Sequence, residues 1–237
     1  MILALNTSTP QIGIAVMHKG GWPLANMALL QGPSHFGSLI PAVHFLLENM
    51  GIDIHQIEGV AVTVGPGSFT GLRVGVATAK GFAHALGIPL VGISSLKALA
   101  ISVGKLDNSM IVAPLLDSRR DEVFTTSFLN ENNKLVQIAE EHSVQFDSLS
   151  DIYDPLHTLF IGSNPSVQMP RLSEIYPNGF IAAPVHLWSA DAAAVGSLGL
   201  SRFLCKDYDD LQTLTPVYLR PPDIRPNPYA SFFKAKT

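Results

Sequence analysis

Apolar and polar residues alternate along the first hundred positions in runs that predict strands first and helices afterwards. Two short β-prone runs, residues 2–8 and 12–18, are joined by a turn, and residues 24–30 continue them as a third antiparallel strand. The spacing of apolar positions then becomes helical, and helices alternate with strands. These later elements are a helix over 34–51, a strand over 58–65, a helix over 70–86, a strand over 89–94 and a short helix over 95–102.

The same order of elements recurs in the second half of the chain. A second strand meander is predicted over residues 110–139, and helical and strand spacing follow it up to a last helix over 189–204. This repetition predicts an α/β fold of two similar lobes, each with a mixed sheet flanked by helices. We place the lobes at residues 1–104 and 105–222, with the late helix able to pack back on the first lobe, and expect a flexible tail over 223–237.

Composition excludes several classes of protein. The chain has 15 Lys and Arg against 19 Asp and Glu, a net charge of −4, whereas autonomous nucleic-acid binders depend on a clustered basic surface. Cys205 is the single cysteine, so no internal disulfide can form, and its apolar neighbours predict a buried thiol. No apolar run reaches the roughly 20 residues of a membrane span, and the N-terminus lacks the basic start of a signal peptide, so we expect a cytoplasmic location.

The stretch "VGPGSFTGLRVGVATAKGFAHALG", residues 64–87, places a glycine-rich turn between a strand and a helix, as phosphate-binding loops do. A Walker A loop needs lysine after its last glycine, but Leu72 follows Gly71. A dinucleotide fingerprint needs a third glycine where Thr70 stands, and an acidic residue about 20 positions further on, where none is found. The turn is therefore a weak nucleotide motif, and no cofactor is predicted.

The helix after this turn carries only two formal charges, Arg73 and Lys80, so it lacks the broad polar face of an exposed helix. Small residues recur on it at every fourth position, which would let another helix backbone approach closely. We therefore predict that this helix and the preceding one form an outward protein interface; the alternative is that both pack only against each other and their own sheet. The predicted interface residues are Leu39, Ile40, Val43 and Leu47 on the first helix and Gly71, Gly75, Ala79 and Ala83 on the second.

Residues that could catalyse a reaction or bind a metal ion are scarce. The eight histidines include no pair three or four positions apart, the spacing that puts two ligands on one helical face. The G-x-S-x-G pattern of a serine-hydrolase elbow is also absent from the sequence. The charged turn 117–122 is interpreted as a solvated turn with local ion pairs. We predict no catalytic residues, no cofactor-binding residues and no metal site.

Four stretches make the chain similar to the TsaB (YeaZ) family, the non-catalytic paralogues of TsaD in bacterial tRNA threonylcarbamoyladenosine synthesis. In family order they are residues 2–9, 62–100, 114–124 and 215–222, of which the second, "VTVGPGSFTGLRVGVATAKGFAHALGIPLVGISSLKALA", is the most specific. The resemblance is dense in the first half of the chain and sparse from about residue 130 to 211. It implies an actin-like, Hsp70-like (ASKHA) fold of two lobes.

The resemblance also implies a function, that of a scaffolding and activating subunit. Such a subunit pairs with TsaD through its N-terminal helices, and the ATPase TsaE joins the assembly that transfers threonylcarbamoyl to the adenosine next to the anticodon of tRNA. Without TsaD the subunit is expected to form a homodimer, and tRNA is expected to be contacted only indirectly.

Two departures from the catalytic relatives bear on this function. TsaD has two metal-binding histidines four residues apart, and Ser95 and Leu99 stand at the matching positions here. Asn6 stands where the family commonly has an aspartate, which keeps an oxygen ligand but loses its charge. The alternatives that remain are a free-standing ATP-dependent transferase, a metallopeptidase-like enzyme of the same superfamily, and a tRNA-binding module.

Overall fold

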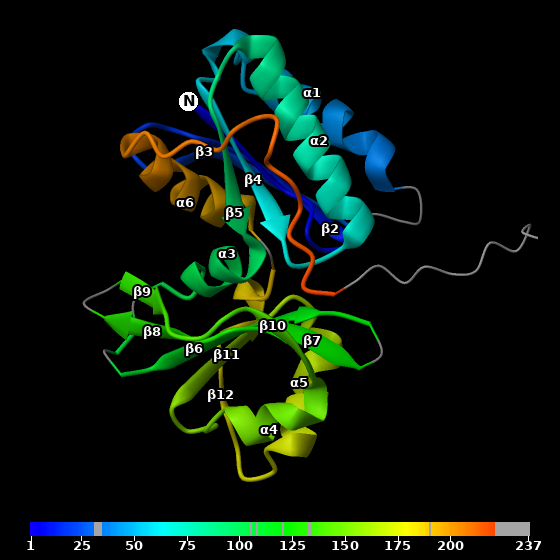
Figure 1. Cartoon of the computed structure of the whole chain (residues 1–237), viewed down its shortest axis with the longest axis vertical. Helices are drawn as coiled ribbons and strands as arrows, with labels where there is room; N and C mark the ends of the chain where they lie inside the picture. Colours follow the sequence, from blue (N-terminus) through cyan, green and yellow to red (C-terminus); the bar gives the residue numbers. More distant parts are fainter. Residues whose placement is uncertain are drawn as a thin grey trace, which may run out of the picture.

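The computed structural model of the chain forms two α/β lobes, drawn one above the other in Figure 1 with the N-terminus in the upper lobe. Each lobe is built on one mixed sheet, and helices flank the sheets. The predicted fold class is therefore confirmed. The structure describes residues 1–30, 35–104, 106–107, 109–119, 121–131, 134–189 and 191–220.

The first sheet joins the predicted meander to parallel strands. Its order is β3-β2-β1-β4-β5, in which β1, β2 and β3 are antiparallel and β1, β4 and β5 run parallel. The central strand β1 is buried along its whole length because helices cover both faces of the sheet. The strands are β1 (Ile2–Asn6), β2 (Gln11–Met17), β3 (Pro23–Leu30), β4 (Gly59–Gly65) and β5 (Leu90–Ser94).

Helices pack on both faces of this sheet. Successive side chains of a strand point to opposite faces, so Leu3 and Leu5 meet α1 and α2, whereas Ala4 meets α6. The helix α6 can approach the sheet closely because Gly196 has no Cβ, which would otherwise strike the Met17 side chain. The helical elements of this lobe are η1 (His35–Ser38), α1 (Leu39–Asn49), η2 (Ile54–Gln56), α2 (Phe69–Leu86), α3 (Ser95–Ile101) and α6 (Ala192–Leu204).

The second sheet has the order β10-β7-β6-β11-β12, and β8 pairs with both β6 and β9. Its strands are β6 (Ile111–Asp117), β7 (Glu122–Thr125), β8 (Phe128–Glu131), β9 (Lys134–Gln137), β10 (His142–Gln145), β11 (Thr158–Gly162) and β12 (Ile181–Ala182). The helical elements are η3 (Phe146–Ser148), α4 (Leu149–Ile152), α5 (Pro165–Ile175) and η4 (Val185–Leu187). β6 and β11 are parallel neighbours, so their carboxyl ends lie at the same edge of the sheet.

Large aromatic side chains fill the core of the second lobe. Phe128, Phe146 and Phe160 are fully buried, and the Tyr153 ring meets Phe160 edge to face at 5.7 Å between centroids. The Tyr153 hydroxyl lies 2.9 Å from Thr125 Oγ1, and burial raises the pKa of this phenol. The polar tip of the tyrosine therefore has a partner inside an apolar core.

The last part of the described chain returns to the first lobe. After α6, Asp209 forms a bridge with Leu90 on the outer edge of β5, and Arg202 donates to the Gly92 carbonyl at 2.9 Å and pairs with Asp209 at 2.8 Å. The chain from α6 to Val217 therefore packs on the first lobe, within the range 105–222 that was expected for the second lobe with its late helix able to pack back on the first. The expected tail, 223–237, lies outside the described residues.

Two local expectations differ from the structure. The helix α5 is absent from the sequence prediction because Pro170 lies inside it and its apolar residues are sparse. Cys205 was expected to be buried but is exposed, because it follows the end of α6 rather than facing the sheet.

Candidate functional site

A cavity of about 330 Å³ lies between the two lobes, where the strand ends of both sheets meet. Residues 66–70, which follow β4, face residues 117–119, which end β6 and follow it. Ligands of open α/β sheets bind beyond the carboxyl ends of parallel strands, so this is the place to look for chemistry. The lining residues are Pro66, Gly67, Ser68, Phe69, Thr70, Asp117, Ser118, Arg119, Phe124, Val217, Tyr218, Leu219 and Arg220.

The glycine turn beside this cavity packs against its own chain. Gly65 and Gly67 have φ values of 131° and 152°, which side chains disfavour, and a Cβ on either would strike a carbonyl oxygen, that of Val217 or Ser8. Ser68 N donates to the same Ser8 oxygen at 2.7 Å. The glycines thus admit neighbouring backbone, and the Ser68 amide is bonded to the β1–β2 turn.

Asn6 supports this turn from inside the lobe. Its side chain is fully buried, and its Oδ1 accepts from Ser8 N at 3.1 Å, from Ser8 Oγ at 2.7 Å and from Thr63 Oγ1 at 3.3 Å. An oxygen with three donors around it is not presented to the cavity. Asn6 therefore stabilises the turn that touches the glycines and does not offer a free ligand oxygen.

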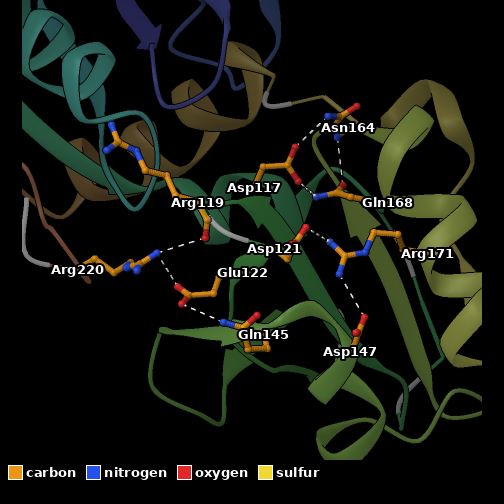
Figure 2. A network of polar contacts seen from close by, with 10 residues as sticks. All are labelled: Asp117, Arg119, Asp121, Glu122, Gln145, Asp147, Asn164, Gln168, Arg171 and Arg220. Atoms are coloured by element: carbon orange, nitrogen blue, oxygen red, sulfur yellow. Dashed lines mark hydrogen bonds and ion pairs between the residues drawn. The ribbon is translucent and has the colours of Figure 1, made fainter. Parts of the chain in front are cut away.

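One carboxylate lines the described cavity, that of Asp117 (Figure 2). Its oxygens accept from Asn164 Nδ2 at 2.9 Å and from Gln168 Nε2 at 2.6 Å, and Gln168 is itself fully buried. Both donors are neutral amides, which orient the carboxylate without neutralising it. Among the described lining residues, Tyr218 is the one other side chain of a type that serves in acid–base catalysis, and its hydroxyl accepts a hydrogen bond from Arg73 Nε at 2.9 Å.

The charged turn 117–122 is tied to distant elements (Figure 2). Arg171 of α5 reaches Asp121 at 3.3 Å and Asp147 at 3.2 Å, and its guanidinium lies over the Phe146 ring at 4.3 Å. This ion pair of the turn is therefore formed with another helix, whose arginine stacks and pairs at once. The expectation of local ion pairs stays a prediction.

The positions that match the metal histidines of the catalytic relatives lie in the joint between the lobes. Ser95 and Leu99, on α3, are both fully buried, and Leu99 belongs to the core of the second lobe. Among the described residues, no group of three His, Cys, Asp or Glu side chains could hold a metal ion. Both positions are enclosed by their neighbours in the folded chain.

The joint between the lobes also contains a half-buried acid. The Glu141 carboxylate, just before β10, accepts a hydrogen bond from Ser94 Oγ at the end of β5. Burial raises the pKa of Glu141, and the hydrogen bond from Ser94 lowers it by less. Ionising this carboxyl group therefore works against the folded arrangement of the two lobes.

Seven of the eight predicted interface residues are buried within the first lobe, which corrects their expected outward position. Leu39, Val43 and Leu47 point into the core between α1 and the sheet, and only Ile40, at 60% exposure, faces away. On α2 the small stripe faces inward, because a Cβ at Gly75 would strike the Thr7 side chain. The buried members of the set are Leu39, Val43, Leu47, Gly71, Gly75, Ala79 and Ala83.

The outward side of the same two helices forms a different surface. Because α1 and α2 cover the same face of the first sheet, their outer sides face the same way (Figure 1). Phe45 on α1 is 57% exposed, and Gly81 on α2 has no atom within 4 Å of a Cβ built on it. We call the exposed residues Ile40, Phe45, Ala77, Gly81 and Ala85 the outer helix face.

The sequence itself carries a pattern that indicates this face. Ala77, Gly81 and Ala85 are a second stripe of small residues at i, i+4 spacing, displaced from the first one around the helix.

In the described part of the chain, no helix is long and apolar enough to cross a membrane.

Comparisons with known proteins agree with the arrangement of the two lobes. The family model of TsaD, tRNA N6-adenosine threonylcarbamoyltransferase, matches residues 30–196. The tRNA threonylcarbamoyladenosine biosynthesis protein TsaB of Bacillus subtilis is 30% identical over 227 residues, which are 92% of this chain and 93% of that protein. TsaB of Escherichia coli is 28% identical over 60% of this chain and 61% of its own length.

Solved structures give the same result. YeaZ from Pseudomonas aeruginosa superposes with a TM-score of 0.76 at 25% identity, covering 92% of this chain and 99% of that one. The ethanolamine utilization protein EutJ from Carboxydothermus hydrogenoformans shares the fold at 14% identity, with a TM-score of 0.52 over 82% of this chain and 88% of that one. The extent of the family-model match and the full-length similarity to TsaB together show that this chain belongs to the TsaB (YeaZ) family.

Proposed function

We propose that this chain is a non-catalytic, activating subunit in tRNA threonylcarbamoyladenosine biosynthesis, and that it pairs with a TsaD-type catalytic subunit. Membership of the TsaB family supports the role in this pathway. A TsaE-type ATPase joins the assembly, and threonylcarbamoyl is transferred by the TsaD-type subunit to the adenosine next to the anticodon. The chain contacts tRNA only through its partners.

The outer helix face is the observation that carries this proposal. It includes two exposed large apolar side chains on α1, Ile40 and Phe45, and three exposed small residues on α2, Ala77, Gly81 and Ala85. Exposed apolar side chains and a helix surface of small residues suit helix–helix contact, because small residues let a partner backbone approach. A second copy of the chain can use the same face when TsaD is absent, which accounts for the expected homodimer.

The interlobe cavity supports the non-catalytic part of the proposal. Its one lining carboxylate, Asp117, is hydrogen-bonded to two neutral amides, and Ser68 Oγ accepts from Gly71 N as a helix cap. We expect the purified chain to show no appreciable ATPase, peptidase or metal-dependent transferase activity. A turnover that follows this polypeptide through purification and disappears in Asp117→Ala would support the free-standing enzyme instead.

Binding to TsaD tests the proposal directly. The variant Ile40→Glu/Phe45→Glu puts two charges on the outer helix face, and we expect its affinity for TsaD to fall by about 30-fold or more, as for loss of an interface hot spot. The matched control is Leu204→Glu, which is 73% exposed on α6, on the opposite face of the same sheet. Titration calorimetry measures affinity, and light scattering measures the homodimer. Unchanged affinity in the double variant would place the contact elsewhere.

A further inference from the structure

Residues 217–220 run across the mouth of the interlobe cavity, and we call them the strap. All four line the cavity, and they are contributed by the segment that follows α6. Consecutive strap residues contact different lobes.

The first half of the strap is attached to the first lobe. Val217 N donates to the Val64 carbonyl in β4 at 2.7 Å, and Gly65 lacks a side chain that would otherwise strike the Val217 oxygen. The Tyr218 hydroxyl accepts from Arg73 Nε at 2.9 Å, and its ring lies 4.8 Å from that of Phe69. Arg73 also lies over Phe69 at 3.9 Å, so the N-terminal turns of α2 and the strap form one packed unit.

The second half of the strap is attached to the second lobe. Leu219 packs against the core of that lobe. Arg220 pairs with Glu122 in β7 at 2.7 Å and donates to the Arg119 carbonyl at 3.3 Å (Figure 2). Glu122 is held in place by Ser143 Oγ at 2.8 Å, and both ion-pair partners are largely buried, with side-chain exposures of 29% and 18%. Such a pair is screened less than one on the surface.

We propose that the strap is an intramolecular clamp that fixes the angle between the two lobes. From Val217 to Arg220 an extended chain spans at most about 11 Å, so it has little slack to follow an opening of the cleft. Opening must therefore break either the Val217–Val64 hydrogen bond or the Arg220–Glu122 pair. Through Arg73 the clamp also holds the N-terminal end of α2, and this second consequence rests on the proposed function, because α2 carries part of the outer helix face.

Distances between the lobes test the clamp in the full-length chain. In a Cys205→Ser background, spin labels at Ser201→Cys on α6 and Glu174→Cys on α5, both exposed positions, report the separation of the lobes. We expect a narrow distance distribution in the parent protein and a broad one, extending to longer distances, in Tyr218→Ala/Arg220→Ala. An unchanged distribution in this double variant would overturn the clamp.

Two further variants distinguish loss of the clamp from a general loss of folded structure. Lys80→Ala removes a contact with the Gln212 carbonyl, which joins the same C-terminal segment to the first lobe only, so the distribution should stay narrow. Glu122→Gln breaks the charge pair from the other side with little change in volume and should broaden the distribution even if the double variant fails to fold. If Glu122→Gln leaves the distribution unchanged, the clamp does not depend on this pair and the proposal fails.

A binding measurement with TsaD keeps this inference apart from the proposed function. Failure of the parent chain to bind TsaD would contradict the proposed function and leave the distance result standing. If the parent chain binds, we expect the double strap variant to bind about fivefold more weakly, the effect of losing the Tyr218–Arg73 hydrogen bond that holds the N-terminal end of α2. Truncation after Pro222 keeps the strap and should match the parent chain in both measurements.

Discussion

The inner and outer faces of α2 carry nearly the same residues in very different surroundings. Gly71, Gly75, Ala79 and Ala83 form the inner stripe and are buried, whereas Ala77, Gly81 and Ala85 form the outer stripe and are exposed. Both stripes have the spacing that lets a neighbouring backbone approach. Their difference teaches that small residues at every fourth position indicate close approach, but not which neighbour approaches.

The inner stripe must be small because the β1–β2 turn touches it. A Cβ at Gly71 would strike the Thr7 carbonyl oxygen, and one at Gly75 would strike the Thr7 hydroxyl. The turn itself is held by the buried hydrogen bonds of Asn6. The helix and the turn therefore support each other, and the outer stripe is left free of any such requirement.

The largest expected effect comes from filling the inner stripe. Gly75→Leu should lower the free energy of unfolding by about 3 kcal/mol or more, or prevent folding, because the added side chain meets the buried Thr7. Gly81→Leu is the matched control, and since its Cβ meets open space it should stabilise the helix by somewhat under about 1 kcal/mol. Urea denaturation measures both. Equal stability of the two variants would remove the distinction between the faces.

Filling the outer stripe should act on binding and not on folding. Ala77→Trp should leave the melting temperature nearly unchanged but lower the affinity for TsaD about tenfold or more, since overpacking a close helix contact costs about 1–3 kcal/mol. The control is Ser201→Trp on α6, an exposed position on the other side of the sheet. Calorimetric titration with TsaD gives the comparison, and equal affinities for the two variants would argue against the outer helix face.

A smaller loss of stability is expected when the Asn6 hydrogen bonds that hold the β1–β2 turn against the inner stripe are removed. Asn6→Ala leaves the buried Ser8 and Thr63 hydroxyls without their acceptor and should cost about 1–3 kcal/mol. Asn26→Ala is the control, because it removes an exposed hydrogen bond to Asp191 and should cost at most about 1 kcal/mol. Chemical denaturation of both variants measures the difference. A cost for Asn6→Ala no larger than for the control would mean that the turn does not depend on Asn6.

The smallest effect concerns pH and lies in the joint between the lobes, away from both faces of α2. Because the pKa of Glu141 is raised in the folded state, its contribution to stability is present in full below its unfolded pKa and is lost as pH rises through the folded pKa. Glu141→Gln should therefore remove a decline in unfolding free energy from about pH 4 upward. Glu140→Gln, the exposed neighbour, should keep the decline. Denaturation at several pH values measures the slopes, and a parallel decline in Glu141→Gln would exclude this residue as its source.

Much of the fold follows from the sequence because it depends on local pattern. Alternating apolar residues define the strands of both meanders, helical spacing and Gly87 define α2 and its end, and Leu72 after Gly71 is enough to exclude a P-loop lysine. The helix α5 was missed because Pro170 and its scarce apolar residues obscure the helical spacing, so contacts with the rest of the second lobe, such as the burial of Leu172, stabilise it.

Tertiary structure decided which surfaces are available. The sequence by itself determined that α2 has small residues along its length, but two such stripes are equally compatible with helical periodicity. The position of Thr7, brought in by β1 from more than 60 residues away, selected the inner one. The return of α6 and the strap to the first lobe likewise depends on contacts such as Gly196 with Met17 and Val217 with Val64. Periodicity describes one element at a time, whereas burial is a property of pairs of elements that only the folded chain brings together.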